Sequence, residues 1–190
     1  YSVLQAATGE ITDMAAVAAK ARRHGALVIA DATQAVGWLP TVHAAAHLVA
    51  RRARGEHHDV PPEWSGGVLS TVAEPLDAVP PISVLADSIQ GRLDDVLRLI
   101  AEHRLILATG HVGRDEVFHV VDRARALGVE RVVVTHAMSD PPGLRAGDHQ
   151  ALAAAGVFLE LTYVTVDMGR VSARDTAEMI RAVGVDRIVL

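Results

Sequence analysis

The feature that most constrains the fold is a repeat of short apolar runs in the second half of the chain. The runs begin near residues 105, 132, 157 and 187, so successive starts are 25 to 30 residues apart. Each interval also holds apolar residues at helical spacing, such as Val117, Val120, Val121 and Ala124. One interval therefore accommodates one strand and one helix, and the continuous apolar runs are typical of strands buried on both faces. The repeat predicts an α/β fold with a parallel sheet.

Two architectures contain such a repeat. A partial (β/α) TIM-type barrel is the first expectation, and a doubly wound open sheet is the alternative. The start of the chain also reads as a helix followed by a strand, over residues 11–23 and 26–30, with Asp31 after the strand. The segment 51–81 is rich in proline, glycine and arginine, which is typical of a long loop or linker.

Composition limits the chemistry that the chain can perform. Half of the 190 residues are hydrophobic, enough for a sizeable core, and the formal net charge of −5 argues against a dedicated nucleic-acid partner. The chain contains no run of 18 apolar residues, the pattern that would predict a membrane span. We therefore expect a cytoplasmic protein that acts on a small-molecule substrate. The chain has no cysteine, so any metal must be bound by histidine and carboxylate. Open sheet edges would favour association into a homo-oligomer.

Polar residues stand where the predicted strands end. His111 and His136 each follow an apolar run, and Glu160 lies within the next run. In parallel sheets the functional residues gather at the C-terminal ends of the strands, so we expect the two imidazoles to lie side by side. A single histidine at such a place is more often a hydrogen-bonded loop residue, but the pair matches what a zinc-like cation needs. Glu116 is interpreted as a charge at a helix N-terminus.

Residues 38–190 resemble a family of amidohydrolase-like proteins, metal-dependent hydrolases of the TIM-barrel class. The matching segments are Leu-Ala-Thr-Gly-His at 107–111, Val-Val-Thr-His at 133–136 and Gly-Val-Phe-Leu-Glu at 156–160. The resemblance implies that His111 and His136 are metal ligands on the fifth and sixth strands, with zinc as the first choice of metal and Glu160 as a catalytic candidate. It also implies that a metal-activated water attacks an amide or ester carbon.

This sequence departs from that family at three places. The His-x-His pair of the family's first strand has no counterpart, and the acidic residue expected after the last strand would lie beyond Leu190. The only lysine, Lys20, lies on the first predicted helix and matches no bridging carboxylated lysine. We therefore expect the C-terminal half of a barrel, with half of a metal site.

Residues 1–40 resemble a different family, the class V aminotransferases and cysteine desulfurases. The run Asp-Ala-Thr-Gln at 31–34 carries this resemblance, which implies that Asp31 pairs with the pyridine nitrogen of pyridoxal phosphate and Gln34 contacts the ring oxygen. A Schiff-base lysine should follow this strand, but none occurs after Lys20. The predicted parts are thus 1–40, a helix and linker over 41–81, and the half-barrel over 82–190.

Three functions follow from these observations. A metal-dependent hydrolase, inactive if its site is incomplete, comes first, and a pyridoxal-phosphate transferase or lyase fragment is its alternative. The third is an α/β fragment without catalysis. The two resemblances meet at residues 37–41, where recombination, an engineered fusion and an assembly artefact all stay open.

Overall fold

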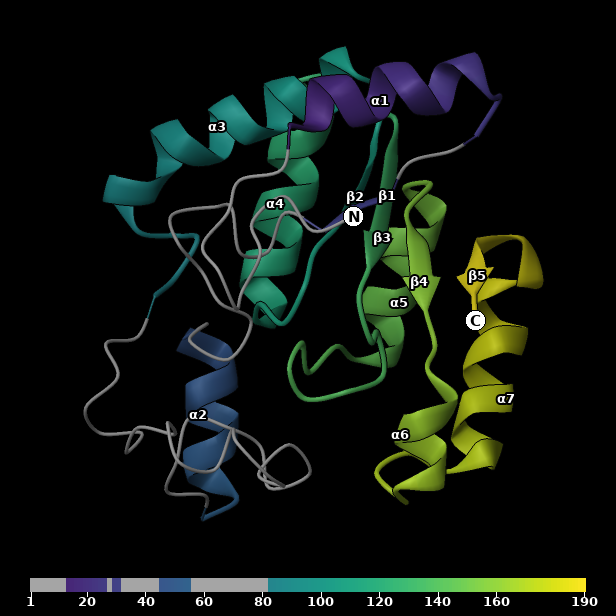
Figure 1. Ribbon diagram of the computed structural model, residues 1–190. Coiled ribbons are helices and arrows are strands. Elements are labelled where there is room, and N and C mark those ends of the chain that lie inside the picture. Colours follow the sequence, from purple (N-terminus) through teal and green to yellow (C-terminus); the bar gives the residue numbers. More distant parts are fainter. Residues whose placement is uncertain (1–12, 27–28, 32–44, 56–81) are drawn as a thin grey trace, which may run out of the picture.

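The computed structural model describes residues 13–26, 29–31, 45–55 and 82–190 (Figure 1). The strands in these ranges are β1 (Ile29–Asp31), β2 (Ile106–Ala108), β3 (Arg131–Val134), β4 (Phe158–Glu160) and β5 (Ile188–Val189). The helices are α1 (Met14–Arg23), α2 (Ala45–Ala53), α3 (Asp87–Glu102), α4 (Arg114–Ala126), α5 (Ala146–Ala154), α6 (Tyr163–Asp167) and α7 (Ala173–Val183). None of the described helices is long and apolar enough to cross a membrane.

The strands form one parallel sheet in the order β1-β2-β3-β4-β5, which is also their order along the chain. This confirms the predicted α/β fold, and β2 to β5 each begin within one residue of the predicted start. The described sheet is open, with β1 and β5 as its edges. A doubly wound sheet would require the strand order to reverse, and the described strands show no reversal.

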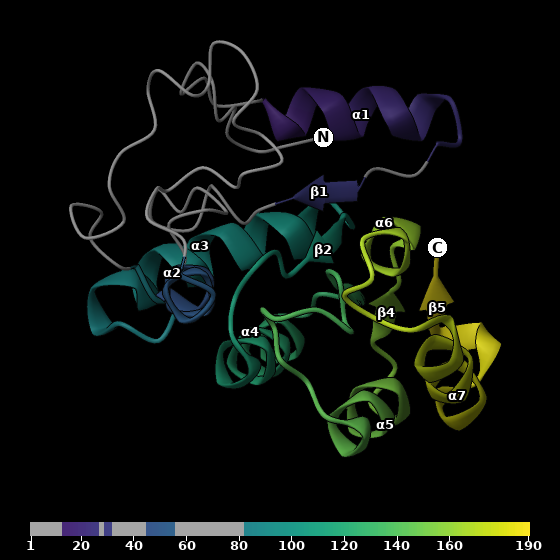
Figure 2. The ribbon, with the colours of Figure 1, turned by 90° about the horizontal axis from the view of Figure 1, so that it is seen from below.

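One face of the sheet carries the core. Leu107, Val132, Val134 and Leu159 are at most 3% exposed, while their neighbours along each strand are only half-buried. Helices α3, α4, α5 and α7 follow one another along the outer side of the strands (Figure 2). Their apolar stripes, predicted from the 3.6-residue spacing, supply the other half of the core. This packing fixes the strands, and with them the points from which the loops at the strand ends begin.

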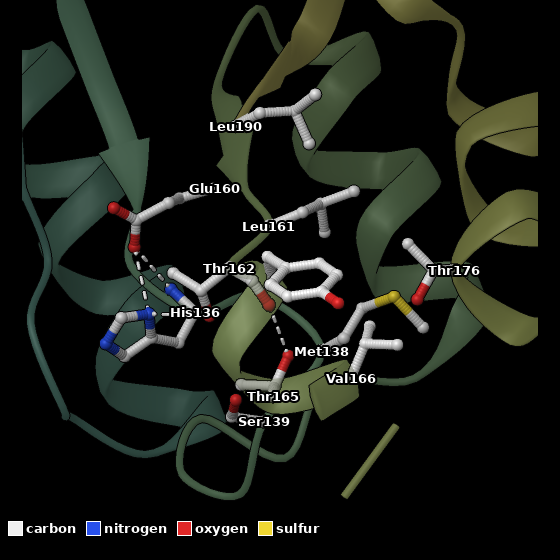
Figure 3. A pocket seen from close by; sticks show the side chains of 11 residues that line it. His136, Met138, Ser139, Glu160, Leu161, Thr162, Thr165, Val166, Thr176 and Leu190 are labelled. Atoms are coloured by element: carbon white, nitrogen blue, oxygen red, sulfur yellow. Dashed lines mark hydrogen bonds and ion pairs between the residues drawn. The ribbon is translucent and has the colours of Figure 1, made fainter. Parts of the chain in front are cut away.

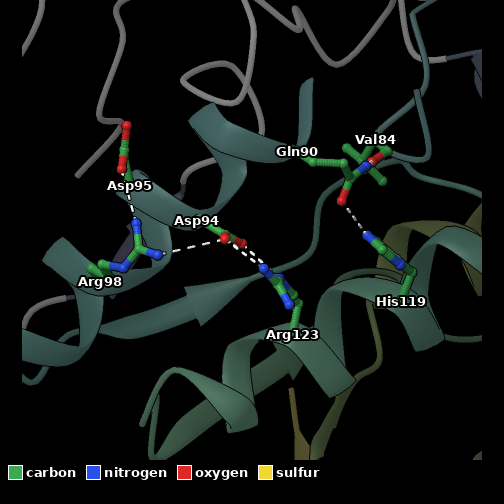
Figure 4. Close-up of polar contacts among 7 residues, drawn as sticks. All are labelled: Val84, Gln90, Asp94, Asp95, Arg98, His119 and Arg123. Carbon is green, nitrogen blue, oxygen red and sulfur yellow. Dashed lines mark hydrogen bonds and ion pairs between the residues drawn. The ribbon is translucent and has the colours of Figure 1, made fainter. Parts of the chain in front are cut away.

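Polar contacts join α3 to α4 at the surface (Figure 4). Arg123 donates two hydrogen bonds to the carboxylate of Asp94, at 2.6 and 2.5 Å. This contact holds the pKa of Asp94 below its usual value. The Nε2 atom of His119 lies 2.8 Å from the side-chain oxygen of Gln90, and the amide of Gln90 donates to the carbonyl of Val84 at 2.6 Å. These side chains fix the long helix α3 against its neighbour.

Helix α2 lies against loops that follow β2 and β3. The backbone N–H of Ala45 donates to the carbonyl of Ile82 at 2.7 Å, and Arg54 donates to the carbonyl of Asp140 at 3.4 Å. A Cβ added to Gly113 would lie 2.9 Å from the Cβ of Ala46, so the close approach of α2 requires glycine there. The helix thus lies at the C-terminal end of the sheet, the end that carries the predicted site.

Candidate functional site

Two threonines tie the end of β2 to the end of β3. The hydroxyl of Thr135 accepts a hydrogen bond from the N–H of Gly110 at 3.0 Å, and that of Thr109 accepts one from the N–H of Thr135 at 3.2 Å. The N–H of Thr109 also donates to the carbonyl of Val133 at 3.0 Å. These bonds extend the pairing of β2 and β3 beyond the ends of the two strands. The residues that follow the two threonines are therefore held at equivalent positions along the sheet.

His111 and His136 are brought together by this alignment. Their ring centroids are 5.1 Å apart and the ring planes are inclined by 45°. The prediction that the two imidazoles lie side by side is therefore confirmed. Their role as metal ligands stays a prediction, because no group of three or more His, Cys, Asp or Glu side chains within the described residues is placed to hold a metal ion.

Glu160 contacts both the backbone N–H and the ring of His136. One carboxylate oxygen accepts a hydrogen bond from the His136 N–H at 2.9 Å and lies 3.1 Å from Nδ1. His136 adopts a φ of 47°, in the left-handed region that residues other than glycine rarely occupy. Strained backbone of this kind costs about 1–3 kcal/mol and is concentrated at functional sites. The contacts with Glu160 hold His136 in this conformation.

The charge of Glu160 and the proton of His136 are coupled. The hydrogen bond from His136 holds the pKa of Glu160 below its ordinary value, with a further contribution from the nearby His111, although burial opposes the shift. Because an ionised carboxylate only accepts hydrogen bonds, the Nδ1 of His136 must carry the proton. In the neutral ring, the lone pair then lies on Nε2. Figure 3 shows Nε2 on the side of the ring away from Met138, Val166 and Thr176.

Glu116 does more than place a charge at the start of α4. It is 6% exposed, and its carboxylate accepts hydrogen bonds from the N–H of Gly113 at 2.7 Å, the N–H of Val84 at 3.0 Å and the hydroxyl of Ser83 at 2.5 Å. It therefore fastens the segment before α3 to the loop that carries His111. The sequence pattern indicates the position of Glu116 on the helix but not its contacts with Ser83 and Val84, which lie 33 and 32 residues away in the chain.

A pocket of about 260 Å³ adjoins His136 and Glu160 (Figure 3). Its remaining wall comes from the loop after β3, the residues after β4, helix α6, helix α7 and Leu190. Helix α6 is not predictable from its segment Tyr-Val-Thr-Val-Asp, which is rich in β-branched residues that favour strands. The two threonines before the histidines belong to the matching sequence segments, but those segments do not indicate that the threonines link the strands.

The other predicted site residues lie elsewhere or outside the described ranges. Asp31 is the last residue of β1, where its register partner is Ala108 of β2, so its backbone lies at the same sheet edge as the histidine pair. Gln34 lies outside the described residues, and the pyridoxal phosphate assignment therefore stays untested. Lys20 lies on α1, the helix that precedes β1, as predicted.

Comparison with known proteins gives one match. The sequence profile of a family of unknown function, DUF6282, matches residues 2–160, a range that includes β1 to β4 and the three site residues His111, His136 and Glu160. The match runs through residues 37–41, where the two resemblances meet. Searches of curated proteins and of solved structures found no match. Because the matched range covers most of the chain, the protein belongs to the DUF6282 family.

Proposed function

We propose that this chain supplies part of the centre of a metal-dependent hydrolase, with His111 and His136 as ligands of a divalent cation, zinc first. The observation that carries the proposal is the approach of the two rings to 5.1 Å at the ends of adjacent parallel strands. The sequential order of the strands supports a further proposal, that the sheet is a sector of a (β/α) barrel. The reaction would be hydrolysis of an amide or ester.

The histidine pair fits two positions of a zinc site. Two imidazoles that bind one zinc at about 2.0–2.1 Å with a tetrahedral angle have ring centroids about 5 Å apart. The separation here is 5.1 Å. Within the described residues, no third His, Cys, Asp or Glu side chain is placed to complete such a site.

Glu160 acts in this proposal through His136. Metal-binding histidines commonly donate their other N–H to a carboxylate, which fixes the ring and makes the ligating nitrogen more basic. Glu160 lies 3.1 Å from Nδ1 of His136, which leaves Nε2 as the ligating atom. We therefore propose that Glu160 is a positioning residue. A cation held by the pair would supply the Lewis acidity that polarises a carbonyl and activates water.

Zinc binding to single-histidine variants tests the proposal. Metal-free wild type, His111→Ala, His136→Ala and the control His24→Ala would be titrated with zinc at pH 7.5 in a calorimeter. His24 is an exposed residue at the C-terminus of α1, at the opposite end of the sheet from the site. We expect each site variant to bind zinc at least about tenfold more weakly, because loss of one ligand from a partial site removes much of its affinity.

The control separates the site from general histidine binding. His24→Ala should keep the wild-type affinity, and wild-type binding should weaken below about pH 6, where imidazole becomes protonated. Equal affinities in all four proteins, or less than a tenth of an equivalent of bound zinc in the wild type, would contradict the metal site. The chain would then be better described as an α/β fragment without a metal centre.

A further inference from the structure

The pocket beside His136 has a mostly apolar wall. Its apolar lining consists of Met138, Leu161, Val166 and Leu190, together with Tyr163. Figure 3 shows Val166 and Met138 extending into the same space across from His136 and Glu160. A volume of about 260 Å³ lies just below the range of about 300–1,000 Å³ typical of sites for drug-sized ligands. The space therefore suits one ring or one branched aliphatic group.

Two of the hydroxyl groups around the pocket already donate to backbone carbonyls. Thr165 donates to the carbonyl of Thr162 at 2.7 Å, and Thr176 donates to the carbonyl of Ser172 at 3.0 Å. The hydroxyl of Thr162 lies 3.4 Å from Nδ1 of His136. Since Thr165 and Thr176 already donate to backbone carbonyls, these two side chains favour an apolar ligand group over one that needs many hydrogen bonds.

Charge further limits what can enter. Among the residues that the structure describes, the lining contains no arginine or lysine, and its carboxylate is Glu160. One oxygen of this carboxylate accepts a hydrogen bond from the backbone N–H of His136 at 2.9 Å and lies 3.1 Å from Nδ1 of the same residue. An anionic group in the pocket would face this carboxylate without a cation to balance its own charge, and it would lose its hydration. A cationic group would compete for a carboxylate that His136 already occupies.

We propose that the pocket binds an uncharged, compact apolar group of the substrate, a single ring or a branched chain, next to the carbonyl that reacts. The reacting carbonyl would lie at the histidine pair and the apolar group on the other side of the His136 ring. This placement rests on the proposed function, whereas the preference of the pocket for an uncharged apolar group does not depend on metal.

Probe binding to the metal-free full chain tests the inference. Three compounds with the same ring would be compared at pH 7: cyclohexanecarboxamide, cyclohexanecarboxylate and cyclohexylmethylammonium. Binding would be followed by amide chemical shifts in nitrogen-15 NMR spectra. We expect the neutral amide to bind, with its largest shifts at residues 138–139 and 161–166. Each charged probe should bind about tenfold more weakly or worse, a difference that corresponds to about 1.4 kcal/mol.

A matched pair of variants on α6 checks the location. Val166 lines the pocket, whereas Val164 on the same helix is 53% exposed and does not. Val166→Trp should fill the space and weaken binding of the amide about tenfold, as expected when a ligand of this size loses most of its contacts. Val164→Trp should leave binding within about twofold of wild type, since it changes the surface alone.

The outcomes distinguish this inference from the proposed function. The inference is contradicted if cyclohexanecarboxylate binds as tightly as cyclohexanecarboxamide, or if no probe binds. It is also contradicted if cyclohexanecarboxamide shifts backbone signals mainly outside residues 138–139 and 161–166. The shift map of the wild type serves as the test if Val166→Trp does not fold. If the amide probe binds and His136→Ala leaves zinc affinity unchanged, the pocket is supported and the metal site is rejected. If no probe binds and His136→Ala weakens zinc binding, the metal site is supported and the pocket is rejected.

Discussion

Asp148 and Glu160 belong to two neighbouring regions at the same end of the sheet, and each pairs with a cationic or potentially cationic side chain. Asp148 lies at the start of α5, where Arg114 donates to it at 2.7 and 2.6 Å and the N–H of Arg145 donates at 2.9 Å. The hydrogen bonds from Arg114 lower its pKa to about 2. The pKa of Glu160 is lowered in the same direction by His136. A lowered pKa alone therefore does not separate a structural carboxylate from a functional one.

The surroundings of the two carboxylates differ in three ways. The partner of Asp148 is the guanidinium of Arg114, whereas the partner of Glu160 is the imidazole and backbone N–H of His136. The side chain of Asp148 is 10% exposed, and that of Glu160 is 30% exposed beside a pocket. Only Glu160 holds a residue with left-handed backbone. The region of Asp148 thus has the features of a packed structural contact, whereas that of Glu160 has the exposure and the cavity that the proposed site requires.

The largest expected effect lies on the packed face, one residue from Glu160. Leu159 is 0% exposed, so Leu159→Ala should lower the free energy of unfolding by about 2–5 kcal/mol through lost burial and the cavity that remains. Urea denaturation measures this change. Val164→Ala, at an exposed position, is the control and should have little effect. A loss below about 1 kcal/mol for Leu159→Ala would mean that this side of β4 is not the packed face, and the comparison would fail.

The second effect sharpens the role of Glu160 and rests on the proposed metal site. Glu160→Gln keeps the shape of the side chain but removes its charge, so zinc affinity should fall about 10–100-fold. Its free energy of unfolding should change by less than about 1 kcal/mol, because the side chain is half-buried and the amide oxygen can still accept the N–H of His136. Glu130→Gln, at an exposed position paired with Arg104, is the control and should leave zinc binding unchanged. If Glu160→Gln lowers stability without changing zinc affinity, Glu160 belongs with the structural carboxylates.

The sequence predicted the frame of the fold better than the details of the site. The spacing of apolar runs placed the starts of β2 to β5 within one residue, because buried parallel strands require continuous apolar segments. The same pattern predicted that His111 and His136 lie close together, since equivalent points of adjacent parallel strands are neighbours. The hydrogen bond that the N–H of His136 donates to Glu160 was not predictable, because His136 there has a positive φ that no local sequence pattern requires at a histidine. The pocket escaped prediction since its wall joins segments far apart in the chain.

The third effect concerns the region of Asp148. Asp148→Asn should lower the free energy of unfolding by about 1 kcal/mol, through lost charge-assisted hydrogen bonds to Arg114 and a weaker contact with the N–H of Arg145. The value stays small because Arg114 is 42% exposed and water partly replaces its bonds. Asp115→Asn is the matched control, because Asp115 pairs with the same arginine but is 79% exposed. Equal losses in the two variants would show that burial of Asp148 adds nothing.

The smallest effect is the loss of that contribution in acid. The folded-state pKa of Asp148, about 2, lies below the ordinary 3.8, so the folded protein binds this proton less readily than the unfolded chain does. The stability that Asp148 provides is therefore complete above about pH 4 and declines as the pH falls towards 2. The difference in unfolding free energy between wild type and Asp148→Asn should be constant from pH 7 to pH 5 and smaller at pH 3, measured by urea denaturation. A difference that stays constant or grows at pH 3 would show that the carboxylate does not depend on its charge to join α4 and α5. The contrast with the pocket carboxylate would then have to rest on exposure and cavity alone.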